Sequence, residues 1–190
     1  LIPMIKFNEK NKNLKKIFDV ICDKLPESIF KTLGFNFFRN LVLKKIIYVY
    51  SINVDNKLAS VITVINYKNY DLINGFVIKH LLIKPHKILL NFFKLFKSLS
   101  KTSKLYIRPN YLHLLHLIIF KDKFNKYTIS KKDKIINSFY KKILRKHNAN
   151  TLFLCFDKSN IGALKYYSRN SFKPFHDIGS IIYYKKKYKI

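Results

Sequence analysis

The stretch Leu152–Phe172 constrains the fold more than any other part of the sequence. It opens with an apolar run, Leu152–Phe156, that has the length and composition of a buried strand. A short polar turn follows, and Asn160 stands where it can cap the helix that begins after it. Apolar residues then recur at helical spacing until a polar pair that precedes Phe172. The pattern predicts a strand, a capped helix and a further strand in close succession.

The helix of this block carries the pattern N-x-x-A-x-x-Y-Y-x-x-x-S-F, formed by Asn160, Ala163, Tyr166, Tyr167, Ser171 and Phe172. It resembles the last sequence block of the GNAT superfamily of N-acetyltransferases, N-x-x-A-x-x-[FLY]-Y-x-x-x-G-F, with Ser171 in place of the family's glycine. An unrelated α/β protein with the same order of elements is the alternative, because each residue type alone is common. The resemblance implies a GNAT-like acyl-CoA N-acyltransferase fold, in which helices flank a central mixed, mostly antiparallel sheet.

The other apolar patterns follow the element order of that family, so we expect residues 1–190 to form a single GNAT-like domain. The resemblance is strongest over residues 111–185 and concerns only topology before that. Gly34 is either a weak point in one helix or the end of a shorter one. The predicted elements are strands at Ile2–Phe7, Ile46–Asn53, Leu58–Asn66, Tyr111–Phe120, Phe172–His176 and Ile178–Lys185, and helices at Leu14–Leu25, from Glu27 to Leu41 and from about Lys132 to Lys146.

Residues 67–104 form the divergent part of the chain, which we expect to be partly helical. Within them, Ile88–Leu99 reads as a basic amphipathic helix with one apolar and one lysine-rich face. Such a helix can contact an anionic membrane surface, although it more often covers a sheet or lines a pocket. Family topology also implies that Leu25–Leu43 faces the acceptor, while core packing would explain the same apolar residues.

The formal net charge of +28 suggests a polyanionic partner. An A+T-rich coding sequence gives the same excess of Lys, Asn, Ile, Phe and Tyr, so part of this charge need carry no function. Arginine, which suits bidentate recognition of phosphate or guanine, is scarce here. We therefore expect nonspecific binding of polyanions at low salt rather than sequence-specific recognition.

Cys22 and Cys155 are far apart in sequence and lie in apolar surroundings, which predicts buried thiols in a reducing compartment. No signal-peptide pattern or membrane-spanning run is present, so we expect a cytoplasmic protein. The terminal run Lys185–Ile190 reads as a solvated charged tail. The sequence has no G-x-S-x-G, H-E-x-x-H, P-loop or G-x-G-x-x-G pattern and no metal-ligand spacing, which argues against those hydrolase, nucleotide-binding and metal-dependent classes.

The segment after Tyr111–Phe120 occupies the place of the family's acyl-CoA pyrophosphate loop, [QR]-x-x-G-x-[GA]. Backbone N–H groups at a helix N-terminus are what such a phosphate site requires. The best alignment puts Asn125, Thr128 and Ser130 at the motif positions, and a register two residues later uses Tyr127, Ser130 and Lys132. With the capped helix, the implied cofactor-binding residues are Ile119, Phe120, Asn125, Thr128, Ile129, Ser130, Lys131, Asn160, Ala163 and Tyr167.

Direct acyl transfer needs donors for the thioester carbonyl oxygen and a proton for the departing thiolate. The resemblance assigns the first role to backbone N–H groups near Ile118–Phe120 and the second to Tyr167. The central strand has no glutamate to act as a general base. His116 is the candidate there, with a pKa expected near neutrality, and His113 should lie on the opposite face of the strand.

The leading hypothesis is an N-acetyltransferase that moves an acetyl or other acyl group from acyl-CoA to a primary amine by direct attack. The acceptor can be a small amine, an amino sugar or a protein N-terminus, and the sequence does not identify it or the oligomeric state. The alternative is a catalytically weakened GNAT-fold module that binds a polyanion or a protein partner through its lysine-rich surface. The missing loop glycines favour that second hypothesis.

Overall fold

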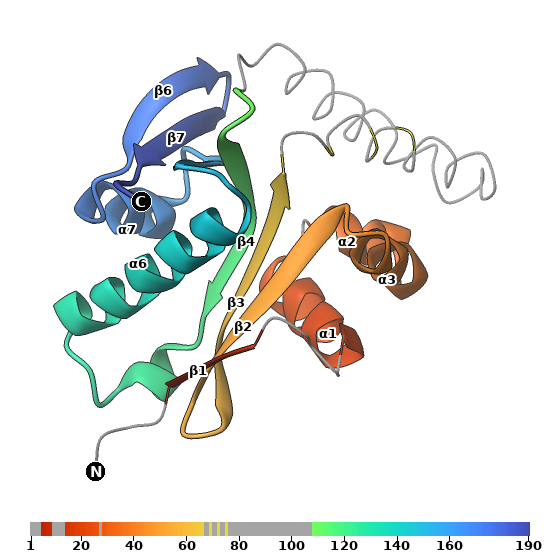
Figure 1. Ribbon diagram of the computed structural model, residues 1–190, viewed down its shortest axis with the longest axis horizontal. Helices are drawn as coiled ribbons and strands as arrows, with labels where there is room; N and C mark the ends of the chain where they lie inside the picture. Colours follow the sequence, from red (N-terminus) through yellow and green to blue (C-terminus); the bar gives the residue numbers. More distant parts are fainter. Residues whose placement is uncertain are drawn as a thin grey trace.

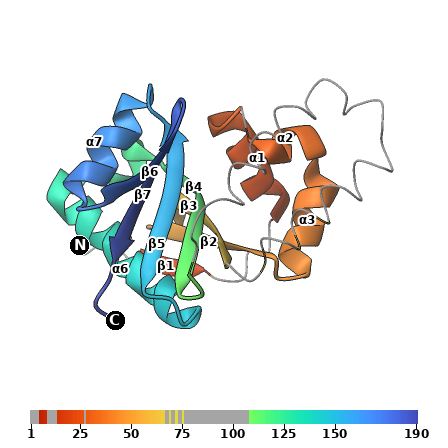
Figure 2. The ribbon, with the colours of Figure 1, turned by 90° about the horizontal axis from the view of Figure 1, so that it is seen from above.

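The computed structural model describes residues 5–8, 14–26, 28–66, 69, 72, 75 and 108–190. These residues form a seven-stranded sheet in the order β1-β2-β3-β4-β5-β7-β6, with helices on both faces (Figures 1 and 2). The elements in chain order are β1 (Ile5–Asn8), α1 (Leu14–Lys24), α2 (Ile29–Leu33), α3 (Phe35–Leu43), β2 (Ile47–Val54), β3 (Lys57–Asn66), β4 (Tyr111–Ile119), the 3₁₀ helix η3 (Lys121–Phe124), α6 (Ile129–Lys146), β5 (Thr151–Asp157), α7 (Ile161–Arg169), β6 (Lys173–Ile178) and β7 (Ile181–Lys187).

The sheet is mixed, because β4 and β5 are parallel and every other neighbouring pair is antiparallel. This confirms the predicted architecture. The β2–β3 hairpin turns at Asp55 and Asn56, whose φ angles of 50° and 62° match the left-handed residues that tight hairpins prefer. The hairpin expected from the two β-rich runs is therefore confirmed.

Helices α1, α2 and α3 cover the face of the sheet formed by β2, β3 and β4 (Figure 2). Gly34, with φ of 85°, separates α2 from α3, so the second predicted helix is in fact two. Contacts between aromatic rings stabilise this layer. The rings of Phe30 and Phe38 pack edge to face at a centroid distance of 5.0 Å, and those of Phe18 and Phe38 pack at 5.7 Å. The apolar residues of Leu25–Leu43 thus have a packing role.

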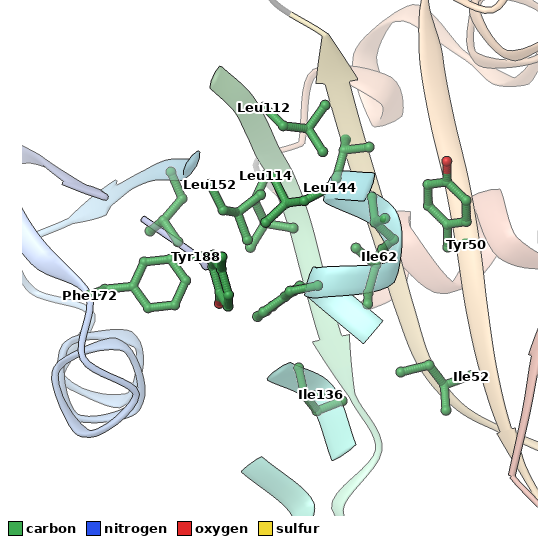
Figure 3. Close-up of a cluster of buried hydrophobic side chains, with 14 of the residues drawn as sticks. Tyr50, Ile52, Ile62, Leu112, Leu114, Ile136, Leu144, Leu152, Phe172 and Tyr188 are labelled. Carbon is green, nitrogen blue, oxygen red and sulfur yellow. The ribbon is translucent and has the colours of Figure 1, made fainter. Parts of the chain in front are cut away.

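Helices α6 and α7 cover the opposite face, over a core that draws on β2 to β5 and β7 (Figure 3). Ile136 and Leu144 of α6 are fully buried in the same cluster as Leu112 and Leu114 of β4. α6 begins at Ile129, three residues before the predicted start, because Thr128 caps it by accepting a hydrogen bond from Lys131 N.

The end of α7 explains why serine stands where the family has glycine. The N–H of Ser171 donates to Ser168 O and that of Phe172 to Tyr167 O, both at 3.0 Å, which is the Schellman pattern. The residue at the turn must adopt a left-handed conformation, and Ser171 does so with φ of 63°. A serine tolerates this conformation at a cost that glycine would not carry.

We therefore expect Ser171→Gly to stabilise the protein by about 0.5–1 kcal/mol, since relief of about 1–2 kcal/mol of left-handed strain exceeds the extra chain entropy of glycine. Urea unfolding measures the difference. Ser168→Gly is the matched control, because the same substitution inside the helix should destabilise by about 0.5 kcal/mol. Equal effects of the two substitutions would contradict the strain argument.

The terminal lysine run was predicted to be a solvated tail, and this prediction is wrong. β7 extends through it to Lys187, and Tyr188 is buried with 4% exposure. Lys186 Nζ donates to Asn137 Oδ1 (3.0 Å) and Asn170 O (2.7 Å), and Tyr188 OH donates to the same Asn137 oxygen (3.0 Å). This polar network joins α6, the end of α7 and the chain end, and the sequence pattern gave no sign of it.

The expectation of buried cysteines is also wrong, since Cys22 is partly exposed and Cys155 is exposed, both as free thiols. The amphipathic segment Ile88–Leu99, and with it the proposed membrane contact, lies outside the described residues. In the part of the chain that the structure describes, no helix has the length and apolarity to cross a membrane.

Candidate functional site

β4 and β5 separate soon after they begin. Their parallel pairing covers only the first three residues of each strand, from Tyr111 with Thr151 to His113 with Phe153. Beyond this point, among the described strands, β4 pairs only with β3 and β5 pairs only with β7. Within the described chain, the β5-facing backbone of residues 114–119 therefore has no strand partner. Backbone polar groups need hydrogen bonds, so this edge is chemically suited to a ligand's polar groups.

A β-bulge lies in the same stretch of β4. Thr63 of β3 is opposite His116 and Val64 is opposite Leu114, so Leu115 has no opposing residue. A bulge inserts one residue, bends its strand and changes the alternation of side chains. His113 and His116 are consequently close enough for His116 to influence the pKa of His113. The prediction that they occupy opposite faces is wrong because it assumed an unbroken strand.

The direction of the backbone N–H groups shows which of them can meet a ligand. Phe120 N donates to Ala59 O of β3 at 2.9 Å, so it cannot provide the N–H expected of it. N–H groups alternate sides along a strand. Ile119 and Leu117 therefore direct their N–H groups away from β3, towards the side on which β5 has diverged. Ile119 is among the predicted residues, and Leu117 is not.

The N-terminus of α6 follows directly after β4 and η3. Thr128 O accepts from Lys132 N, the first helical hydrogen bond, and Thr128 Oγ1 accepts from Lys131 N. The N–H groups of Ile129 and Ser130 precede these and have no acceptor within the helix. Residues 128–131 are all exposed, with the Ile129 side chain 59% accessible. Uncompensated N–H groups at a helix N-terminus attract anions.

This arrangement bears on the alignment of the loop. Of the two registers, the one that uses Thr128 and Ser130 matches the helix start directly. Asn125 is exposed at the end of η3, three residues before the cap. Tyr127, which belongs to the other register, is half-buried and lies under Lys131 Nζ, 5.3 Å from its ring centroid.

The helices that follow β4 and β5 both begin near the carboxyl ends of those strands, where the strands are apart. α6 starts at Ile129 and α7 at Ile161, with Asn160 Oδ1 accepting from Ala163 N at 2.9 Å. Ligands of α/β proteins commonly bind outside the carboxyl ends of parallel strands. The topology thus places the β4 edge, the start of α6 and the start of α7 around one end of the sheet.

Tyr167 lies on α7 against the diverging part of β5. Its ring stacks on Phe156 at a centroid distance of 5.6 Å, and the side chain is 8% exposed. Burial raises the pKa of Tyr167 well above its usual value, with smaller contributions from Tyr166 and the Cys155 thiol. The hydroxyl therefore stays protonated at neutral pH.

Protein atoms around Cys155 raise its pKa to about 11 although its side chain reaches solvent, so this thiol is a poor nucleophile.

His116 is held from the other face by α2. Its Nε2 lies 3.3 Å from Ser28 Oγ, and its ring meets Phe30 edge-on at 5.3 Å. Burial lowers the pKa of His116 to about 4. The expected pKa near neutrality is therefore wrong, and a base this weak is poorly matched to an amine at neutral pH. A catalytic role for His116 stays a prediction.

Both histidines should make stability depend on pH. Burial, and then the charge of His116, lowers the pKa of His113 to about 3. As pH falls through 6.5 the unfolded chain binds protons that the folded chain does not, so stability is lost from pH 6.5 towards pH 4 and below. We expect the free energy of unfolding to fall by about 2 kcal/mol per histidine between pH 7 and pH 5.

Urea unfolding at pH 7, 6 and 5 checks this expectation. His113→Phe keeps the flat ring that stacks on Phe153 at 4.4 Å but removes one titrating group. It should roughly halve the pH dependence. If the free energy of unfolding of the wild type falls with pH no more steeply than that of a variant lacking both histidines, the assignment of the pH dependence to His113 and His116 is contradicted.

Among the described residues there is no group of three or more His, Cys, Asp or Glu side chains that could hold a metal ion. Asp133, the buried acid of α6, instead accepts from Arg169 Nε of α7 at 2.7 Å. This ion pair was not predicted. Its partners are 36 positions apart, so only the packing of the two helices brings them together.

The sequence matches no protein-family model and no curated protein. The structure is similar to that of the N-acetyltransferase PseH of Campylobacter jejuni, solved with acetyl coenzyme A, with a TM-score of 0.54, 18% identity and coverage of 97% of this chain and 99% of that chain. It is similar to PaiA N-acetyltransferase of Thermoplasma acidophilum, solved with coenzyme A, at a TM-score of 0.53, 15% identity and coverage of 97% and 99%. A GNAT-family acetyltransferase of Listeria monocytogenes gives 0.55, 13% identity and coverage of 97% and 94%.

The fold is thus the GNAT-like acyl-CoA N-acyltransferase fold, as the sequence predicted. The diverging pair β4 and β5 marks the point in this fold where the candidate site is assembled. Ile119, the α6 start and Tyr167 belong to the elements around that point, whereas the Phe120 N–H is directed into the sheet.

Proposed function

We propose that the protein is an acyltransferase that moves an acyl group, most simply acetyl, from acyl-CoA to a primary amine. The observation that carries this proposal is the separation of β4 from β5 beside an exposed, uncompensated helix N-terminus. Two proteins of similar fold were solved with acetyl coenzyme A or coenzyme A, which supports this choice of cofactor.

In this proposal the pyrophosphate binds at the start of α6. The N–H groups of Ile129 and Ser130 donate to phosphate oxygens, and the Thr128 hydroxyl and the ammonium group of Lys131 lie on the same exposed turn. A glycine-free loop can serve here because the donors are backbone groups. Asn125, Asn160 and Ala163 stay predicted contacts of the cofactor.

The acyl group lies along the unpaired edge of β4. The N–H groups of Ile119 and Leu117 donate to the carbonyl oxygen, which becomes an oxyanion when the amine nitrogen attacks the carbonyl carbon. A C–N bond forms, the C–S bond breaks, and the leaving thiolate takes the hydroxyl proton of Tyr167. The nitrogen releases a proton to solvent, and solvent returns one to Tyr167.

A second function is favoured by the basic face of α6. Lys131, Lys134 and Lys141 are exposed, while the acid of this helix, Asp133, is buried. Burial and then the charge of Lys141 lower the pKa of Lys186, so cations are crowded here. A module that binds a polyanion through this face is the alternative to an enzyme.

Isothermal titration at moderate salt with acetyl-CoA, desulfo-CoA and heparin separates the two functions. The enzyme proposal predicts one-to-one binding of both CoA compounds that persists when salt is raised enough to release heparin. CoA binding that disappears together with heparin binding would leave the polyanion module as the better account.

A further inference from the structure

The hydrogen bonds of Ser28 indicate which nitrogen of the His116 imidazole carries the proton. Ser28 caps α2, and its Oγ accepts from Phe30 N at 3.4 Å. Its own hydroxyl hydrogen is then available to His116 Nε2, 3.3 Å away. With Nε2 accepting, a neutral imidazole carries its proton on Nδ1. When Ser28 donates to Nε2 in this way, His116 is a donor through Nδ1, on the side turned away from Ser28.

Among the residues that the structure describes, that Nδ1 atom is buried and pairs with no other group. The residue opposite His116 in the β3–β4 register is Thr63, which has 0% exposure and a hydroxyl that is likewise unpaired. Two unsatisfied polar groups on neighbouring strands are costly to bury, and both lie beside the bulge at Leu115. One oxygen atom that accepts from Nδ1–H and bonds the Thr63 hydroxyl would satisfy both.

We propose that Thr63 and His116 form a subsite that binds a hydroxyl group of the acceptor, so the acceptor is a hydroxylated amine. This inference rests on the proposed acyl transfer for its link to the amine. His116 belongs to the part of β4 that pairs with β3 along one edge and, in the proposed mechanism, binds the acyl group along the other. The subsite therefore lies within one strand's width of the reacting centre. A neutral imidazole and a hydroxyl favour an uncharged oxygen over a carboxylate or phosphate.

The experiment compares 2-aminoethanol with propylamine, which has a methyl group in place of the hydroxyl, and glucosamine with cyclohexylamine, which has none of the sugar's hydroxyls. We expect kcat/KM, expressed per concentration of unprotonated amine, to be at least about tenfold higher for the hydroxylated member, because the alkyl analogue leaves both protein groups unpaired. Thr63→Val, which keeps the shape, should reduce this ratio to within about twofold, and Thr63→Ser should restore it. Ser60→Ala removes a buried hydroxyl of β3 that donates to Ile118 O, and should leave the ratio unchanged.

A second readout does not depend on turnover. In nitrogen NMR spectra of the full chain, 2-aminoethanol or glucosamine should shift the Nδ1 resonance of His116 in the wild type but not in Thr63→Val. Absence of any shift would overturn the subsite, even if acetyl-CoA binds and is turned over. If Thr63→Val shifts the Nδ1 resonance but neither amine does, the oxygen atom between Thr63 and His116 belongs to water, and the subsite proposal is also overturned. A shift without acyl transfer would support the subsite and refute the proposed function.

Discussion

Tyr167→Phe is expected to lower kcat by about 10²-fold while KM for acetyl-CoA changes less than about threefold. The phenylalanine ring preserves the stacking on Phe156, so the change removes little beyond the hydroxyl. Without that hydroxyl the thiolate must leave unprotonated or take its proton from solvent. Release of CoA, followed with a thiol reagent on an amine that the wild type acetylates, gives both constants.

The neighbouring tyrosine provides the control. Tyr166 is also partly buried and has a raised pKa, but its hydroxyl interacts with Tyr140 of α6. Tyr166→Phe should leave kcat within about twofold of the wild type. The assignment of Tyr167 as the acid fails if the two variants have the same kcat.

Ser130→Glu is expected to weaken acetyl-CoA binding by at least about 100-fold, because it puts a carboxylate beside the N–H groups that would hold the pyrophosphate. The same carboxylate complements the helix dipole and should raise stability by about 0.5 kcal/mol. Loss of binding together with higher stability cannot be attributed to unfolding. Isothermal titration and urea unfolding on one preparation measure the two effects.

Ser138→Glu introduces the same charge at an exposed position further along α6. It should reduce acetyl-CoA affinity by less than about threefold through long-range electrostatics, which salt screens. If Ser138→Glu weakens binding as much as Ser130→Glu does, the cofactor is held by the general charge of the helix and its N-terminus is not the site.

The parts of the fold that could be predicted are those set by local pattern. Asn160 caps α7 as expected, and the hairpin and the helical periods follow from residue spacing. Ser171 marks a limit of that reasoning. The alignment showed that a glycine was missing, but only the backbone angle shows that the serine adopts the conformation that glycine would have supplied.

The site depended on tertiary features that spacing alone does not encode. The bulge at Leu115 breaks the period of two, so it reverses the expected relation between His113 and His116. Burial then moves the His116 pKa far from its sequence-based value. Asn137 accepts a hydrogen bond from Lys186 near the chain end, but in the sequence it looks like an ordinary polar helix residue.

Hydrogen–deuterium exchange with and without acetyl-CoA tests the central claim most directly, because it reports which backbone N–H groups the ligand covers. We predict slower exchange at residues 114–119, the unpaired edge of β4, and at residues 129–130, with little change at residues 138–146. Binding with no protection at β4 or at the start of α6, or with protection confined to the outer face of α6, would contradict an acyl-CoA site at the divergence of β4 and β5.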